Sequence, residues 1–103
     1  MDRIQQIQEL LQDSPKDSFL RHALALEFVK RGDDAAARQL FEALLADEPG
    51  YVGSYYHLAH LLERNGQTSE AIACFEKGME VAKQQADQHA FNELRSAWEE
   101  LTM

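Results

Sequence analysis

Histidine and cysteine are the side chains of this sequence best suited to metal binding or nucleophilic chemistry. The chain of 103 residues contains four histidines and a single cysteine, Cys74. His57 and His60 stand three residues apart, but no HExxH or Cys/His spacing accompanies them. Zinc needs ligands that converge at about 2.0–2.1 Å, whereas His22 and His89 fall on other expected helices. We therefore expect no metal site and no cofactor, and we expect Cys74 to be a small buried hydrophobic residue.

The patterns that carry catalysis are also missing from the sequence. It contains no glycine-rich phosphate loop, no GxSxG motif, and no carboxylate pair that a helical register would place in a pocket. The acidic neighbours Asp33-Asp34 and Glu99-Glu100 point to different sides of their helices. A lone cysteine excludes an intramolecular disulfide. We therefore expect that this protein is not an enzyme.

The charge of the chain limits the partners that it can bind. Eighteen acidic residues against ten basic ones give a formal charge of −8, and each half of the sequence carries −4. Phosphate backbones and anionic membranes are bound by clustered Lys and Arg, which this sequence lacks. No apolar run approaches the ~18 residues of a membrane span, and the start has no apolar signal segment. We expect a cytoplasmic protein that binds neither nucleic acid nor membrane.

The residue types predict helices throughout. Ala, Leu, Glu and Gln account for 47 residues, whereas Val, Ile and Thr number only 8. Gly32 and Gly66 follow basic residues, as glycines that end helices do, and Asp33 suits a helix N-cap. Short connections between helices predict antiparallel hairpins. Six helices are expected, near residues 2–13, 17–31, 34–48, 51–65, 68–84 and 88–102.

An internal repeat is the most informative feature of the sequence. A shift of 34 residues superimposes seven pairs of identical or similar residues: Leu24 and Leu58, Ala25 and Ala59, Phe28 and Leu62, Gly32 and Gly66, Ala37 and Ala71, Phe41 and Phe75, Glu42 and Glu76. One such pair would arise by chance, but seven at one offset would not. The pairs form apolar stripes on facing helices, in which the small Ala25 permits close approach and Phe41 fills the space.

This pattern resembles the tetratricopeptide repeat (TPR) family, whose unit is a helix–turn–helix of about 34 residues. The resemblance implies an all-α fold, a TPR-like α-solenoid of antiparallel helix pairs, in a single domain over residues 1–103. One unit would span 18–51 and a second 52–85. Residues 2–13 would form an N-terminal half-unit helix, and residues 88–102 a C-terminal capping helix.

Two residues depart from the family pattern within the two units. Arg21 stands where the family favours a large aromatic residue, as Tyr55 provides in the second unit. Lys83 replaces the closing proline, so that the fifth helix is expected to be longer than the third.

The last expected helix departs from the register of the repeat. Its apolar residues follow a 3-4-3 spacing and lie about two residues later than a strict shift of 34 would place them: Phe91, Leu94, Trp98 and Leu101. Arg95 then takes the position at which Ala25 and Ala59 allow close packing. The mismatch predicts that the array stops at this helix.

The resemblance also implies a binding surface, because the first helices of successive TPR units line a groove that receives a peptide or a helix. By the family pattern the candidate residues are Phe19, His22, Leu26, Val29, Tyr56, His60, Glu63, His89 and Asn92, with Gly53, Ser96 and Glu99 beside them. The clamp by which some TPR domains hold chaperone carboxylates uses Lys, Asn and Arg, but the corresponding groove positions hold His22, Leu26, Tyr56 and His60, so that specificity is not expected. We expect an apolar or basic protein segment as the partner.

Two functions remain open on the sequence. The first is a non-catalytic scaffold or adaptor that binds a protein segment in the groove. The alternative is a self-associating module, a homodimer in which the apolar residues of the end helices pair across a two-fold axis. Those residues are Ile4, Ile7, Leu11, Trp98 and Leu101.

Overall fold

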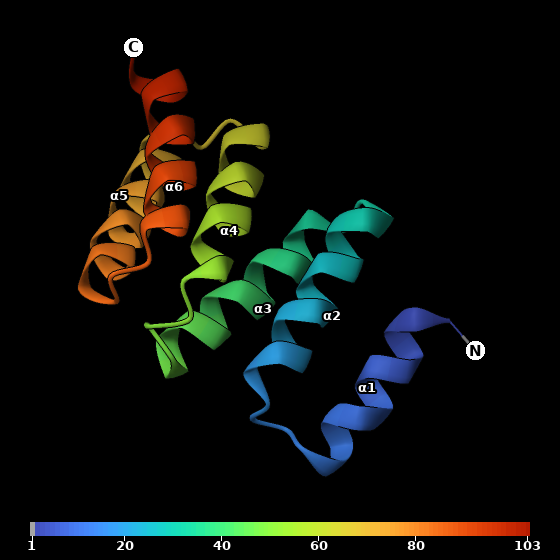
Figure 1. Cartoon of the computed structure of the whole chain (residues 1–103). Coiled ribbons are helices and arrows are strands. Elements are labelled where there is room, and N and C mark those ends of the chain that lie inside the picture. Colours follow the sequence, from blue (N-terminus) through green and yellow to red (C-terminus); the bar gives the residue numbers. More distant parts are fainter. Residues whose placement is uncertain (1) are drawn as a thin grey trace. The chain divides into compact units, whose positions relative to one another are not determined.

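All regular secondary structure in the described part of the chain is α-helical. The computed structural model describes residues 2–103 (Figure 1). The helices are α1 (Arg3–Asp13), α2 (Ser18–Arg31), α3 (Asp34–Asp47), α4 (Gly53–Arg64), α5 (Thr68–Gln84) and α6 (Gln88–Thr102). Each begins and ends within two residues of the expected range, and the all-α fold with about six helices is confirmed.

The chain divides into two compact units at Glu48 and Pro49. Unit 1 contains α1, α2 and α3, and α2 packs against both of its neighbours. Unit 2 contains α4, α5 and α6, and there α5 packs against both of the others. Each unit therefore contains three helices, in which a central helix packs antiparallel against the other two.

Aspartate caps and left-handed residues fix where the helices begin and end. The side chains of Asp2, Asp17, Asp33 and Asp87 each accept a hydrogen bond from the backbone N–H three residues later. The expected role of Asp33 as a cap is confirmed. At the ends of α2 and α4 the two glycines expected there adopt left-handed backbone angles, with φ of +85° and +81°.

The end of α5 differs from those two because an alanine takes the left-handed position. Ala86 has φ of +56°, and the N–H of Asp87 bonds back to the carbonyl oxygen of Ala82 at 2.9 Å. α5 contains 17 residues and α3 contains 14, so the expectation that the helix without a closing proline is longer is confirmed.

The core of unit 1 joins α1 to the hairpin of α2 and α3. Ile4 and Ile7 of α1 are buried in one cluster with Leu24 of α2. Phe41 and Ala25, on facing helices, are fully buried. Because α1 buries its apolar face in this cluster, the half-unit helix is part of the hydrophobic core of unit 1.

In unit 2 a glycine allows three helices to approach closely. A Cβ atom on Gly78 of α5 would lie 2.7 Å from the Cβ atom of Tyr55 and 3.1 Å from Cδ1 of Leu94. Tyr55 belongs to α4 and Leu94 to α6, and both are buried. The hydroxyl of Tyr55 donates a hydrogen bond to the carbonyl oxygen of Pro49 at 2.6 Å, and burial raises the pKa of this phenol.

The structure gives a physical reason for Arg21, the residue that departs from the aromatic pattern. Arg21 and Tyr55 are equivalent under the shift of 34, and so are the fully buried Leu44 and Gly78. Unit 2 thus combines an aromatic residue with a glycine, whereas unit 1 combines an arginine with a leucine. The guanidinium of Arg21 lies 3.0 Å from Oδ2 of Asp47, and hydrogen bonds from Lys16 and Arg21 lower the pKa of that carboxyl.

Candidate protein-binding surface

Two neighbouring hollows lie between α4 and α6 in unit 2. The first, of about 340 Å³, is lined by Tyr56, His60, Asn92, Glu93, Ser96, Ala97 and Glu100. The second, of about 260 Å³, is lined by Val52, Gly53, Tyr56, His57, Ala90, Glu93 and Leu94. Tyr56 of α4 and Glu93 of α6 line both hollows. They make the two hollows one continuous candidate surface.

The ring of Tyr56 is held in place by its neighbours on α4. It is half-buried and meets the imidazoles of His57 and His60 edge to face, at centroid distances of 5.5 and 4.5 Å. His60 in turn meets the fully buried ring of Phe75 at 5.3 Å. Such aromatic contacts limit side-chain motion, so Tyr56 is a rigid platform supported by the core.

The polar atoms around Tyr56 form short ionic links along each helix. Nδ1 of His60 lies 3.4 Å from Oε1 of Glu63 on α4. Nε2 of His89 lies 3.0 Å from Oε1 of Glu93 on α6. Each link is an ion pair only when its imidazole is protonated.

The imidazole of His57 resists protonation in the folded chain. Burial of its imidazole lowers its pKa below the ordinary value of 6.5, the nearby His60 lowers it further, and Glu93 opposes the shift. His57 therefore stays neutral in the native state at a pH at which the unfolded chain already takes up a proton.

This difference predicts a loss of stability in mild acid. The contribution of His57 is complete above pH 6.5, decreases as the pH falls towards its lower native pKa, and is constant below that value. We expect thermal unfolding between pH 7.5 and 5.5 to show a falling midpoint, and His57→Gln to make the decline shallower. Equal slopes for the wild type and the variant would contradict the assignment to His57.

The structure brings together some of the candidate residues in unit 2 and separates others. Tyr56, His60 and Asn92 line the first hollow, together with Ser96, and Gly53 lines the second. Glu63 is linked to the first hollow through His60. His89 and Glu99 line neither hollow. The side chain of His89 is 86% exposed, and Glu99 pairs with Arg95 at 2.7 Å.

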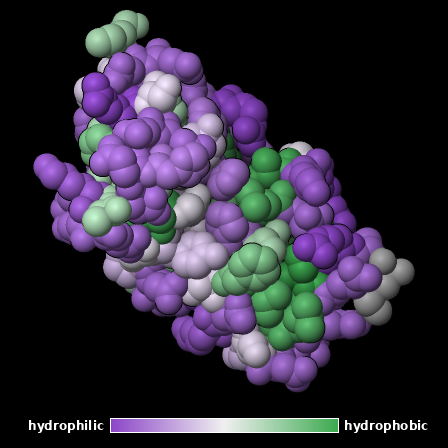
Figure 2. Space-filling view, in the orientation of Figure 1, coloured by the Kyte–Doolittle hydropathy of each residue, from purple (hydrophilic) through white to green (hydrophobic). Residues whose placement is uncertain are grey.

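The candidate residues in unit 1 lie along α2. Phe19 is 70% exposed, and Leu26 and Val29 are half-buried. The imidazole of His22 meets the ring of Phe41 edge-on at 5.8 Å, so this histidine rests on the core of unit 1. Figure 2 shows hydrophobic residues gathered over α1 and α2. Leu10 of α1 is 54% exposed.

Comparison with known proteins identifies the family. A family model for the tetratricopeptide repeat matches residues 28–94, which is well over half of the chain. The chain belongs to the tetratricopeptide repeat family. TPR domains generally mediate protein–protein interactions and are typically not catalytic.

Solved structures agree with this assignment. A TPR domain protein from Salinibacter ruber, solved in solution, has 41% identity over 84% of this chain and 88% of its own, with a TM-score of 0.81. The crystal structure of a TPR domain protein from the same organism has 41% identity over 84% of this chain and 97% of its own, with a TM-score of 0.80.

A more distant structure supports the fold alone. A protein from Bordetella parapertussis, solved in solution, is 22% identical over 99% of this chain and 89% of its own, with a TM-score of 0.86. These neighbours confirm the TPR-like α-solenoid class. No curated protein matches the chain.

Several residues of this TPR surface were not predicted from the sequence. They are His57, Ala90, Glu93, Ala97 and Glu100. The four on α6 lie on one side of the helix, because their spacings of three, four and three residues correspond to whole turns. That side adjoins the apolar stripe through Leu94, because each of the four residues immediately precedes a residue of the stripe. A wider choice of positions on the last helix would have found them.

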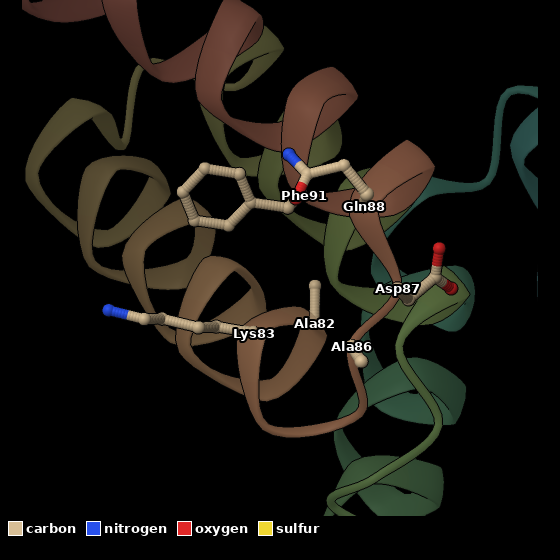
Figure 3. Close-up of a pocket in the computed structure, with 6 residues that line it drawn as sticks. All are labelled: Ala82, Lys83, Ala86, Asp87, Gln88 and Phe91. Carbon is tan, nitrogen blue, oxygen red and sulfur yellow. The ribbon is translucent and has the colours of Figure 1, made fainter.

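Another hollow lies at the turn between α5 and α6, away from the candidate residues. It has about 180 Å³ and is lined by Ala82, Lys83, Ala86, Asp87, Gln88 and Phe91. Figure 3 shows the ring of Phe91 above Ala82 and Lys83. The carboxylate of Asp87 already accepts the hydrogen bond that caps α6, so this hollow is best explained by the turn itself.

Other sequence expectations concern metal binding, membranes and Cys74. Within residues 2–103, no three His, Cys, Asp or Glu side chains gather as a metal site would require. No helix in the same range is long and apolar enough to cross a membrane. Cys74 is half-buried instead of buried, and its thiol donates to the carbonyl oxygen of Tyr55 at 3.5 Å.

The apolar residues of the end helices differ in how far they remain available for self-association. Ile4 and Ile7 are buried in the core of unit 1, and Leu11 packs against the same cluster. Trp98 and Leu101 are half-buried, and the indole N–H of Trp98 donates to Glu76 at 3.1 Å. The self-association alternative rests on α6 and stays a prediction.

Proposed function

We propose that this TPR chain is a non-catalytic scaffold or adaptor that binds a peptide or helical segment of another protein. The observation that carries the proposal is the pair of hollows between α4 and α6, with the half-buried ring of Tyr56 shared by both. Hollows with a rigid aromatic anchor and a few polar groups suit the binding of peptide side chains.

The proposed surface in unit 2 is formed by Tyr56, His60, Glu63 and Asn92, with His89 at its edge. In unit 1 we propose that the exposed face of α2 also takes part in binding. It carries Phe19, His22, Leu26 and Val29. Phe19 is 70% exposed, so a partner that covers this face would bury its apolar surface.

The proposal also includes the charge of the partner segment and the cellular location of the chain. With a formal charge of −8, the chain favours a basic or neutral partner segment over an acidic one. We propose a cytoplasmic location, in which a single half-buried cysteine would stay reduced.

Affinity capture with quantitative mass spectrometry tests this function. We expect the Tyr56→Ala variant to retain at least about ten-fold less of each partner protein than the wild-type chain does. The reason is that an anchor residue in a hollow contributes on the order of 2 kcal/mol to binding. Leu26→Glu should act in the same way through the face of α2. Circular dichroism must show unchanged helicity in both variants. Recovery of the same proteins in the same amounts would contradict the proposal.

A further inference from the structure

The two hollows between α4 and α6 combine an aromatic platform with carboxylates, and no lysine or arginine lines them. We propose that this surface recognises arginine, in a protein segment that carries two arginines three residues apart. The inference rests on the proposed function and specifies the chemistry of the partner. It is carried by Tyr56, Glu93 and Glu100, which lie together in the first hollow.

Tyr56 provides the surface on which a guanidinium can stack. Its ring lines both hollows and makes T-shaped contacts with the imidazoles of His57 and His60. A cation placed on the face of a tyrosine is attracted by the ring quadrupole, and the planar guanidinium of arginine stacks better than the ammonium of lysine. The ring cannot turn away without losing its contacts with His57 and His60.

The carboxylates of α6 provide the opposite charge. Glu93 lines both hollows beside Tyr56, and Glu100 lines the first hollow two turns further along the helix. Glu63 of α4 adds a third carboxylate next to His60. The residues that line the two hollows include no lysine or arginine.

The basic residues of unit 2 lie elsewhere. Lys77 pairs with Glu80 on α5, and Arg95 pairs with Glu99 on α6. Lys83 lines only the hollow at the turn between α5 and α6. Arg64, the last residue of α4, lines neither hollow between α4 and α6. Glu93 has the imidazole of His89 as a neighbour at 3.0 Å, and a cationic ligand would add the counter-charge that lysine and arginine do not provide inside the hollows.

The spacing of the two carboxylates on α6 gives the spacing of the ligand. Seven residues of helix separate Glu93 from Glu100, which corresponds to about 10 Å along the axis. In an extended polyproline-type segment, residues three apart lie on the same side and are about 9 Å apart. Two arginines at that spacing can therefore meet Glu93 with Tyr56, and Glu100, at the same time.

Fluorescence anisotropy with a labelled peptide tests the proposal. The probe contains the sequence Arg-Ala-Pro-Arg between neutral residues, and the control peptide has both arginines replaced by glutamine. We expect the full chain to bind the probe with a Kd of about 10–500 μM, and to bind more weakly as salt rises. Glu93→Gln and Glu100→Gln should each weaken binding about two- to five-fold, and the double variant about ten-fold.

Two controls separate local recognition from general attraction. Glu80→Gln changes the net charge by the same amount on an exposed residue of α5 outside the hollows, and it should leave the Kd unchanged. Tyr56→Ala should weaken binding about five-fold or more. An equal loss in Glu80→Gln and Glu93→Gln would show attraction by net charge alone and overturn the proposal.

The outcomes also separate this inference from the proposed function. Absence of saturable binding below about 1 mM overturns the inference, as does equal affinity for the glutamine peptide. In either case the proposed function is decided independently by affinity capture with the Tyr56→Ala variant. Binding of the probe that depends on Glu93, Glu100 and Tyr56 supports both.

Discussion

Phe75→Ala is expected to destabilise unit 2 by about 3–5 kcal/mol, the range for removal of a fully buried aromatic side chain. Phe75 is 0% exposed in α5, and its ring meets the imidazole of His60 at 5.3 Å. The loss combines the transfer free energy of the ring with the cost of the cavity left behind. Since folded domains are stable by only about 5–15 kcal/mol, this change removes a large part of the total.

Urea unfolding followed by circular dichroism measures this effect. Phe19→Ala is the matched control, because it removes the same ring from a position that is 70% exposed. The control should change the free energy of unfolding by less than about 0.5 kcal/mol, as surface substitutions usually do. Similar losses in the two variants would contradict the placement of Phe75 in the core.

Gly78→Ala is expected to destabilise unit 2 by about 1–3 kcal/mol, the usual cost of adding atoms to a packed core. The sign is informative, because glycine inside a helix is normally less favourable than alanine by about 0.5–1 kcal/mol. Here the new Cβ atom would lie 2.7 Å from Cβ of Tyr55. A Cβ atom is fixed to the backbone, so one of the two helices must shift.

The same unfolding experiment checks this prediction. Ala73→Gly, at an exposed position of α5, is the matched control for helix propensity and should cost about 0.5–1 kcal/mol. Stabilisation by Gly78→Ala would mean that α4 and α5 do not approach as closely as Tyr55 and Gly78 require. Destabilisation by both variants is the expected result.

Most of the fold could be predicted because its determinants are local or periodic. Gly32, Gly66 and Asp33 mark helix ends through backbone geometry and capping, which depend on few neighbours. The repeat of 34 residues places apolar residues such as Phe41 and Phe75 on faces that must be buried. Both kinds of signal can be read along the chain.

The candidate surface was harder to predict because it depends on the rotation of α6. From the sequence, the apolar stripe places the last helix, and four positions at helical spacing were expected on the surface: His89, Asn92, Ser96 and Glu99. In the structure the first hollow is lined by a broader face of α6, which also includes Glu93 and Glu100. Helix rotation is set by side-chain packing, here by Leu94 against Gly78, which the spacing alone does not determine.

Nuclear magnetic resonance mapping of the ¹⁵N-labelled chain tests the central claim most directly. The ligand is the partner segment recovered by affinity capture, added in steps to the full chain. We expect the largest changes in amide shifts on α4 and α6, at Tyr56, His60, Asn92 and Ser96, which line the first hollow. Changes confined to α1 or to α5, with α4 and α6 unaffected, would contradict the claim that this TPR chain binds its partner through that surface.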